Sequence, residues 1–139
     1  MIRIAFYWNT RDPWRRVDLF RPIISRASRV LRRDAEIACT FVDARTSRTW
    51  NARYRGKHHP ANVLSVGWDS PEGIAGDILL CPAVIRRESR KFGMSFARRA
   101  SHLFIHGILH CYGYDHQSLY QQKRMESREV YCLGYNPYV

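Results

Sequence analysis

Three histidines in the C-terminal third of the chain, His106, His110 and His116, have the residue type and spacing of a metal site. His106 and His110 are four residues apart, so a helix places both imidazoles on one face, one turn apart. Gly113 can adopt a positive φ, end that helix and let the chain bring His116 back to the same point. Three neutral imidazoles with a fourth position left for water are typical of catalytic zinc sites, where the metal lowers the pKa of bound water to about 7.

Other residues near this pattern leave alternatives open. His102 lies one turn earlier on the same predicted helix, so spacing alone also permits a pair of His102 and His106. The turn at Gly113 favours the later trio, and His102 is expected to support the site or to pack beside it. Asp115 and Asp77 could orient a ligand imidazole or accept a proton, because metal-bound histidines usually donate their other N–H to such a group. Each can equally be a cap or turn carboxylate.

The ligand pattern HxxxHxxxxxH has the spacing of the metzincin peptidases, HExxHxxGxxH. Those enzymes carry their general-base glutamate next to the first histidine, where this chain has Gly107. A zinc peptidase or amidase is therefore an alternative hypothesis that lacks its usual proton acceptor.

The charge of the chain favours a polyanionic partner. Lys and Arg total 23 against 12 Asp and Glu, which gives a formal net charge of +11, and all but three of the 23 cations are arginine. The guanidinium group donates two parallel hydrogen bonds to a phosphate, and clustered cations gain affinity by releasing counterions from nucleic acid. The alternative is a solvated arginine surface with no such partner.

The elements that must position the histidines follow from length and hydrophobic periodicity. A chain of 139 residues with 45% hydrophobic residues predicts one packed domain, and no apolar run is long enough to span a membrane. Four cysteines without a CxxC pair argue against a zinc ribbon or a disulfide scaffold and favour a reducing cytoplasm. The architecture predicted is mixed α and β. Strands are predicted at 2–8, 36–42, 62–66 and 76–81, and helices at 19–33, 44–53, 83–92, 96–111 and 118–133.

The string HGILHCYGYDH, from His106 to His116, closely resembles the signature HGxLHxxGYDH of the YbeY family of zinc-dependent endoribonucleases, which are ribosomal RNA maturation factors. Three further blocks agree in the same order: YRGKHHPANVLS (Tyr54 to Ser65), GDILLC (Gly76 to Cys81) and MESREVYCLGYNPY (Met125 to Tyr138). The resemblance by motif thus covers about Tyr54 to Tyr138.

This resemblance implies an α+β, zincin-like single domain over residues 1–139, with a roughly four-stranded mixed sheet packed with helices. It implies that His106, His110 and His116 bind one zinc ion on a long helix and the turn after it, and that Arg55 is the functional arginine of the cleft. The activity implied is metal-dependent endonucleolytic hydrolysis of single-stranded RNA in ribosomal RNA processing. The implied partners are ribosomal RNA and the small ribosomal subunit in the cytoplasm, with no membrane and no DNA. A third hypothesis, of another class, is a non-catalytic RNA-binding ribosome-assembly factor in which zinc holds the domain together.

Two departures from the family pattern bear on the site. The family commonly has LSFP where this chain has Leu64-Ser65-Val66-Gly67, so a differently shaped loop is expected after the third strand. The acidic residues usual after the third histidine are replaced by QSLYQQKR, so we expect the local electrostatics, and any partner docking that relies on acidic residues, to differ from the family.

Overall fold

Four segments of alternating burial form one sheet. The computed structural model describes all 139 residues, from Met1 to Val139. The strands lie in the order β1-β2-β4-β3; β1, β2 and β4 are parallel, and β3 is antiparallel to β4. The strands are β1 (Ile2–Asn9), β2 (Ala35–Val42), β3 (Val63–Ser70) and β4 (Gly73–Leu80). The prediction of an α+β fold with a four-stranded mixed sheet is confirmed, and the assignment to the zincin-like folds stays a prediction.

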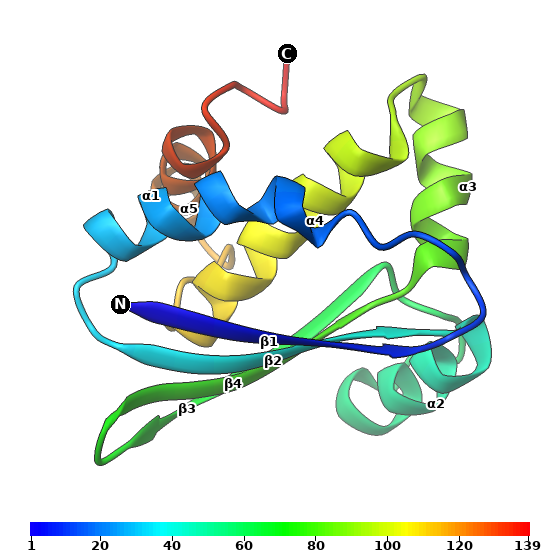
Figure 1. Cartoon of the computed structure of the whole chain (residues 1–139), viewed down its shortest axis with the longest axis horizontal. Coiled ribbons are helices and arrows are strands. Elements are labelled where there is room, and N and C mark those ends of the chain that lie inside the picture. Colours follow the sequence, from blue (N-terminus) through cyan, green and yellow to red (C-terminus); the bar gives the residue numbers. More distant parts are fainter.

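The helices are distributed unevenly over the two faces of the sheet. Helices α1, α4 and α5 cover one face, and α2 lies on the other side near one end of the strands (Figure 1). None of them is long and apolar enough to cross a lipid bilayer. The helices are a 3-10 turn (Val17–Phe20), α1 (Arg21–Val30), α2 (Ala44–Arg55), α3 (Pro82–Phe92), α4 (Phe96–Cys111) and α5 (Leu119–Leu133).

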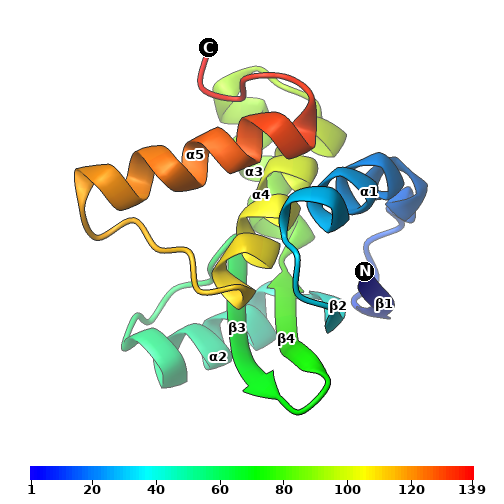
Figure 2. The ribbon, with the colours of Figure 1, turned by 90° about the vertical axis from the view of Figure 1, so that its left-hand side faces the viewer.

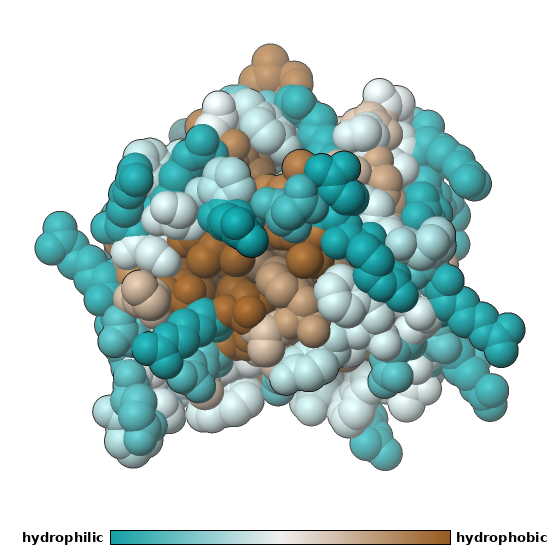
Figure 3. All heavy atoms as spheres, in the orientation of Figure 1, coloured by the Kyte–Doolittle hydropathy of each residue, from teal (hydrophilic) through white to brown (hydrophobic).

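The hydrophobic core lies between the sheet and the helix layer, with α4 at its centre. Phe20 and Phe104 stack with ring centroids 4.2 Å apart, and both are fully buried. Ile78 of β4 and Ile108 of α4 are also completely buried. On the face shown in Figure 3, hydrophobic residues gather between the helix layer and the sheet, and hydrophilic side chains surround them. One continuous core therefore supports both the sheet and the histidine-bearing helix.

Local signals determine where α2 begins and ends. The Asp43 carboxylate caps its first turn by accepting a hydrogen bond from the Thr46 backbone N–H at 2.8 Å. Gly56 ends the helix in the left-handed region, at φ +68°. The helix runs two residues beyond its predicted end at Arg53, so Arg55 occupies its last position. A rigid element, rather than a loop, therefore carries this arginine.

The segment from 67 to 73, expected to be a loop, is largely strand. β3 continues to Ser70, β4 begins at Gly73, and the two form a hairpin closed by Pro71 and Glu72. The predicted end of this strand at Val66 is therefore wrong, because cross-strand pairing extends the sheet through residues whose composition favours a turn.

Gly67 and Gly76 lie directly opposite each other in this hairpin. A Cβ atom on Gly67 would lie 2.2 Å from the backbone oxygen of Cys111, and one on Gly76 would lie 2.7 Å from the Cys111 Sγ atom. Two neighbouring glycines thus let the last turn of α4 rest directly on the sheet. This close approach seats the helix that carries His106 and His110.

We expect Gly67→Ala to destabilise the fold by about 1–3 kcal/mol or more, because the added methyl group meets backbone atoms that no rotamer change can move. Urea unfolding measures the loss. In Gly76→Ala the added methyl group meets the Cys111 sulfur atom instead. Part of the stability lost in Gly76→Ala should therefore be recovered in the double variant Gly76→Ala/Cys111→Ala, for which Cys111→Ala alone is the reference. A Gly67→Ala protein as stable as the wild type would contradict this account of the packing.

Candidate metal centre and active-site cleft

Helix α4 and the turn after it position all three histidines. The Ser95 hydroxyl caps the start of α4 by accepting a hydrogen bond from the Arg98 N–H at 3.1 Å. At the other end Gly113 has φ +91°, and the Tyr114 N–H donates to the Leu109 carbonyl at 3.0 Å. This is the Schellman pattern, which reverses the chain at the end of a helix. The chain beyond Gly113 passes close to the end of α4 before α5 begins (Figure 2).

The three imidazoles converge on one point. The Nε2 atoms of His106 and His110 lie 3.1 Å apart, and one nitrogen from each of His106, His110 and His116 lies within 4.8 Å of the others. Two imidazole nitrogens bound to one tetrahedral zinc ion at 2.0–2.1 Å would be about 3.3 Å apart. The donor set therefore fits a single small divalent metal ion if the His116 ring moves slightly closer to the other two rings.

His110 is held in the protonation state that a ligand requires. Burial, together with the neighbouring His106 and His116 side chains, lowers the pKa of His110 to about 4. At neutral pH the His110 ring is consequently uncharged, and one nitrogen keeps a free lone pair. His116 is the most exposed of the three, with 54% of its side chain accessible.

A buried carboxylate determines which nitrogen of His106 faces the other histidines. Glu129 of α5 is completely buried, and its Oε2 atom lies 2.7 Å from Nδ1 of His106. An ionised carboxylate can only accept, so Nδ1 carries the proton and Nε2 is left unprotonated toward His110. Metal-binding histidines usually have such a partner.

The second oxygen of Glu129 is also satisfied. Its Oε1 atom accepts hydrogen bonds from Nε2 of His102, at 3.2 Å, and from the hydroxyl of Tyr138. Burial alone would raise the pKa of Glu129, but the hydrogen bonds from His102, His106 and Tyr138 outweigh it and hold the pKa at about 2. Helices α4 and α5 and the C-terminal segment are thus joined at one carboxylate that is charged at neutral pH.

A cleft with a volume of about 590 Å³ opens between α2, β3 and the histidines. Its wall includes His106, His110, His116 and Arg55. Arg55 is exposed and its guanidinium group has no hydrogen-bond or ion-pair partner in the protein, so it is available to an anion. The structure therefore brings this arginine and the three predicted ligands into one cavity, although 51 residues separate Arg55 from His106.

The remaining predicted residues have other positions. His102 contacts Glu129 and lies outside the cluster, as expected of a supporting residue. The Asp115 carboxylate accepts from the His116 backbone N–H at 2.7 Å and lies 3.7 Å from its Nδ1 atom. Asp77 lines the cleft and has no hydrogen bond to a histidine. The orienting acid for His106 is instead Glu129.

Sequence reasoning missed Glu129, although a signal for it exists. Met125, Cys132 and Leu133 form the buried stripe of α5, and Glu129 is the one charged residue on that stripe. A single acid at helical spacing among core residues must have a buried partner, since an unpaired charge there is very costly. The partner lies on another helix, so the sequence alone could not have named it.

Comparison with known families gives an independent line of evidence. The family model described as "Endoribonuclease YbeY" matches residues 13–135. A relative from Methylobacillus flagellatus with that name is 34% identical over 99% of this chain and 95% of its own length. Another of the same name, from Alteromonas mediterranea, is 37% identical over 76% of this chain and 72% of its own length.

The fold also has a counterpart of known structure. The solution structure of TM1509 from Thermotoga maritima matches with a TM-score of 0.62 and 22% identity, over 96% of this chain and 90% of that one. This likeness supports the fold alone, whereas the sequence matches carry the family. With the model match spanning most of the chain and relatives above 30% identity, the protein belongs to the YbeY endoribonuclease family.

Proposed function

We propose that this chain is a zinc-dependent endoribonuclease that hydrolyses single-stranded RNA in ribosomal RNA maturation and ribosome quality control. The observation that carries the proposal is the convergence of three imidazoles and a free arginine on one cleft, in a member of a family named for endoribonuclease activity. The small ribosomal subunit in the cytoplasm is the proposed place of action, and residues 1–139 act as one domain.

Zinc is the proposed metal because the donors are three imidazole nitrogens, a set that suits a tetrahedral ion with one open position. An ion of this kind supplies Lewis-acid chemistry, polarising a phosphoryl oxygen and making a coordinated water more acidic. Glu129 keeps the His106 proton on Nδ1 and so directs the Nε2 lone pair into the cleft. Burial keeps the His110 ring neutral and ready to coordinate.

Arg55 has the role of phosphate clamp in this proposal. Its guanidinium group can donate two parallel hydrogen bonds to phosphate oxygens and oppose the negative charge that grows on them during hydrolysis. The net charge of +11 supplies long-range attraction for the RNA backbone, which depends on salt concentration.

The peptidase alternative is not favoured by the packing of α4. A Cβ atom on Gly107 would lie 3.1 Å from side-chain atoms of Ile78, so this position faces the sheet and not the cleft. A glutamate at position 107 would have to displace the buried Ile78 side chain. The non-catalytic alternative predicts salt-sensitive RNA binding without turnover, which a cleavage assay with zinc-loaded protein distinguishes.

His110→Ala should remove zinc and cleavage together, because two imidazoles cannot hold the ion with comparable affinity. Metal analysis of the purified protein and a cleavage assay on a defined single-stranded RNA measure the two losses. His58→Ala, which changes an exposed loop histidine outside the cleft, is the control and should keep both properties. Full cleavage by a metal-free preparation would overturn the proposed function.

Arg55→Ala should lower the rate of RNA cleavage about 100-fold while zinc content is unchanged, because a preorganised donor to the developing charge is lost. Single-turnover kinetics give the rate. Arg48→Ala is the matched control, since Arg48 is an exposed arginine of the same helix that does not line the cleft. Equal rates for Arg55→Ala and the wild type would remove the phosphate-clamp role.

Glu129→Gln should weaken zinc binding roughly 10- to 100-fold, because the neutral amide no longer fixes and polarises the His106 ring. Competition with a chromophoric chelator measures the affinity without an activity assay. Glu126→Gln is the control, because Glu126 is a half-buried glutamate of the same helix whose carboxylate accepts a hydrogen bond from Gln122 and not from a histidine. Tyr138→Phe removes only one hydrogen bond to Glu129 and should give a smaller loss of zinc affinity. Wild-type zinc affinity in both Glu129→Gln and Tyr138→Phe would refute the role of Glu129 in positioning His106.

A further inference from the structure

We propose that Tyr54, supported by Trp50, is a stacking platform that holds one unpaired nucleobase of the RNA on the wall of the cleft. This inference rests on the proposed function and names part of the substrate that the same site recognises. The two aromatic residues are the non-histidine rings of the cleft wall.

The two rings form a preorganised pair. Trp50 and Tyr54 are four residues apart on α2, which places their side chains on the same face of the helix. Their ring centroids are 5.4 Å apart with an interplanar angle of 18°, a stacked arrangement. The Arg53 guanidinium lies over the Trp50 ring, 5.3 Å from its centroid. The stacked Trp50 ring therefore favours one orientation of the Tyr54 ring, which reduces the entropy lost on binding.

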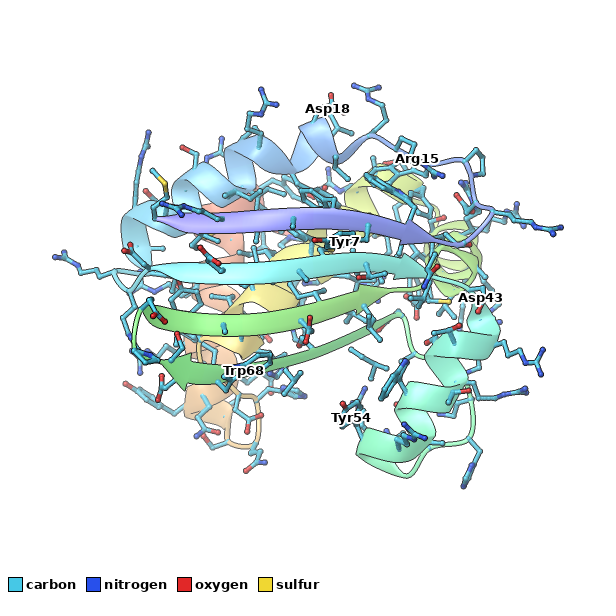
Figure 4. The ribbon with its side chains drawn as sticks, turned by 60° about the horizontal axis from the view of Figure 1, so that its bottom comes forward. Tyr7, Arg15, Asp18, Asp43, Tyr54 and Trp68 are labelled. Atoms are coloured by element: carbon cyan, nitrogen blue, oxygen red, sulfur yellow. The ribbon has the colours of Figure 1, made fainter.

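Tyr54 is nevertheless open on its other side. The residue is 65% exposed, so contact with Trp50 covers only part of its ring. Figure 4 shows Tyr54 on the side of α2 that is nearest β3, whereas Trp68 lies further along β3 and Tyr7 lies on β1. A rigid aromatic ring with one free face is the arrangement on which single-stranded nucleic acid bases stack.

The position of Tyr54 connects the platform to the reacting phosphate. Tyr54 and Arg55 are consecutive residues, so their Cα atoms are about 3.8 Å apart, and both share one cavity with the three histidines. A phosphate held by Arg55 and a base stacked on Tyr54 would accordingly belong to the same or adjacent nucleotides. The platform would thus hold the RNA in register with the metal centre.

This arrangement selects unpaired nucleotides. A base inside a duplex is covered on both faces by its neighbours, so only a base that has left the stack can use a protein ring. The cleft also borders β3, which has a strand partner on one side only, and the outer edge of such a strand presents backbone N–H and C=O groups. These groups can bond the polar edge of a base once it is unpaired.

The other tyrosines near the metal centre are committed to protein contacts. The Tyr112 hydroxyl donates a hydrogen bond to the Arg33 carbonyl, and the Tyr114 hydroxyl accepts one from the Arg128 guanidinium. Neither tyrosine lines the cleft. Base stacking in this cleft is consequently assigned to Tyr54.

The test is equilibrium binding of the zinc-loaded full chain to a short single-stranded RNA with phosphorothioate linkages, which slow cleavage. Tyr54→Ala should weaken binding roughly 5- to 150-fold, the range expected for the loss of one base–aromatic stack. Tyr54→Phe keeps the ring face and should recover most of this affinity. Zinc content is measured for each variant, so that a damaged metal centre is recognised.

The same RNA is then made as a series with one abasic nucleotide at each successive position. At the position that meets the platform, loss of the base should weaken binding to the wild type and leave binding to Tyr54→Ala unchanged, because both changes remove the same contact. Tyr7→Ala, an exposed tyrosine of the opposite edge strand, is the control and should bind like the wild type.

Two results would overturn the inference and leave the proposed function intact. One is a Tyr54→Ala protein that binds the unmodified RNA as tightly as the wild type. The other is a Tyr54→Ala protein whose affinity falls below that of the wild type by the same factor on every RNA of the abasic series. In either case the wild type still binds and cleaves single-stranded RNA. A wild-type protein that neither binds nor cleaves RNA when loaded with zinc would instead refute the proposed function, and the inference with it.

Discussion

The contact between the end of α4 and the β3–β4 hairpin is the constraint on which the site depends. Gly67 of β3 lies against the Cys111 backbone and Gly76 of β4 lies against the Cys111 side chain, and any side chain at position 67 would push β3 and α4 apart. This contact fixes the last turn of α4 against the edge of the sheet, where β3 borders the cleft. His110 on that turn and His106 one turn earlier therefore line the same cavity as Arg55 of α2. Because a close-packed interior is hardly compressible, a shift at this contact would also displace the histidines.

Glu129 supplies the second constraint, through charge instead of shape. A buried carboxylate is tolerated only when hydrogen bonds replace its lost hydration, and here three groups do so. Because those groups come from α4 and from the C-terminal segment, pairing Glu129 also fixes how α5 packs. The same interaction determines the tautomer of His106. The hydrogen bonds of Glu129 thus contribute both to the stability of the fold and to the orientation of a predicted metal ligand, so replacing a residue in this network should affect both.

The cleft combines these fixed groups with groups that have no partner in the protein. Arg55 forms no ion pair, although several other arginines do, including Arg86 with Asp12 and Arg99 with Glu88. Those pairs join separate elements of the fold, whereas the free guanidinium group and the open face of Tyr54 lie beside the histidines. The groups that lack a partner in the protein thus line the cleft, where a charged, aromatic ligand could contact them.

The sequence by itself determined the parts of this protein that depend on neighbours along the chain. The spacing of His106 and His110, the turn at Gly113 and the order of strands and helices all follow from local periodicity and backbone preference. Only the tertiary structure decided that β3 extends past Gly67 and that Glu129 meets His106. These outcomes depend on packing between segments far apart in the chain, where cross-strand pairing and the cost of a buried charge outweigh local preference.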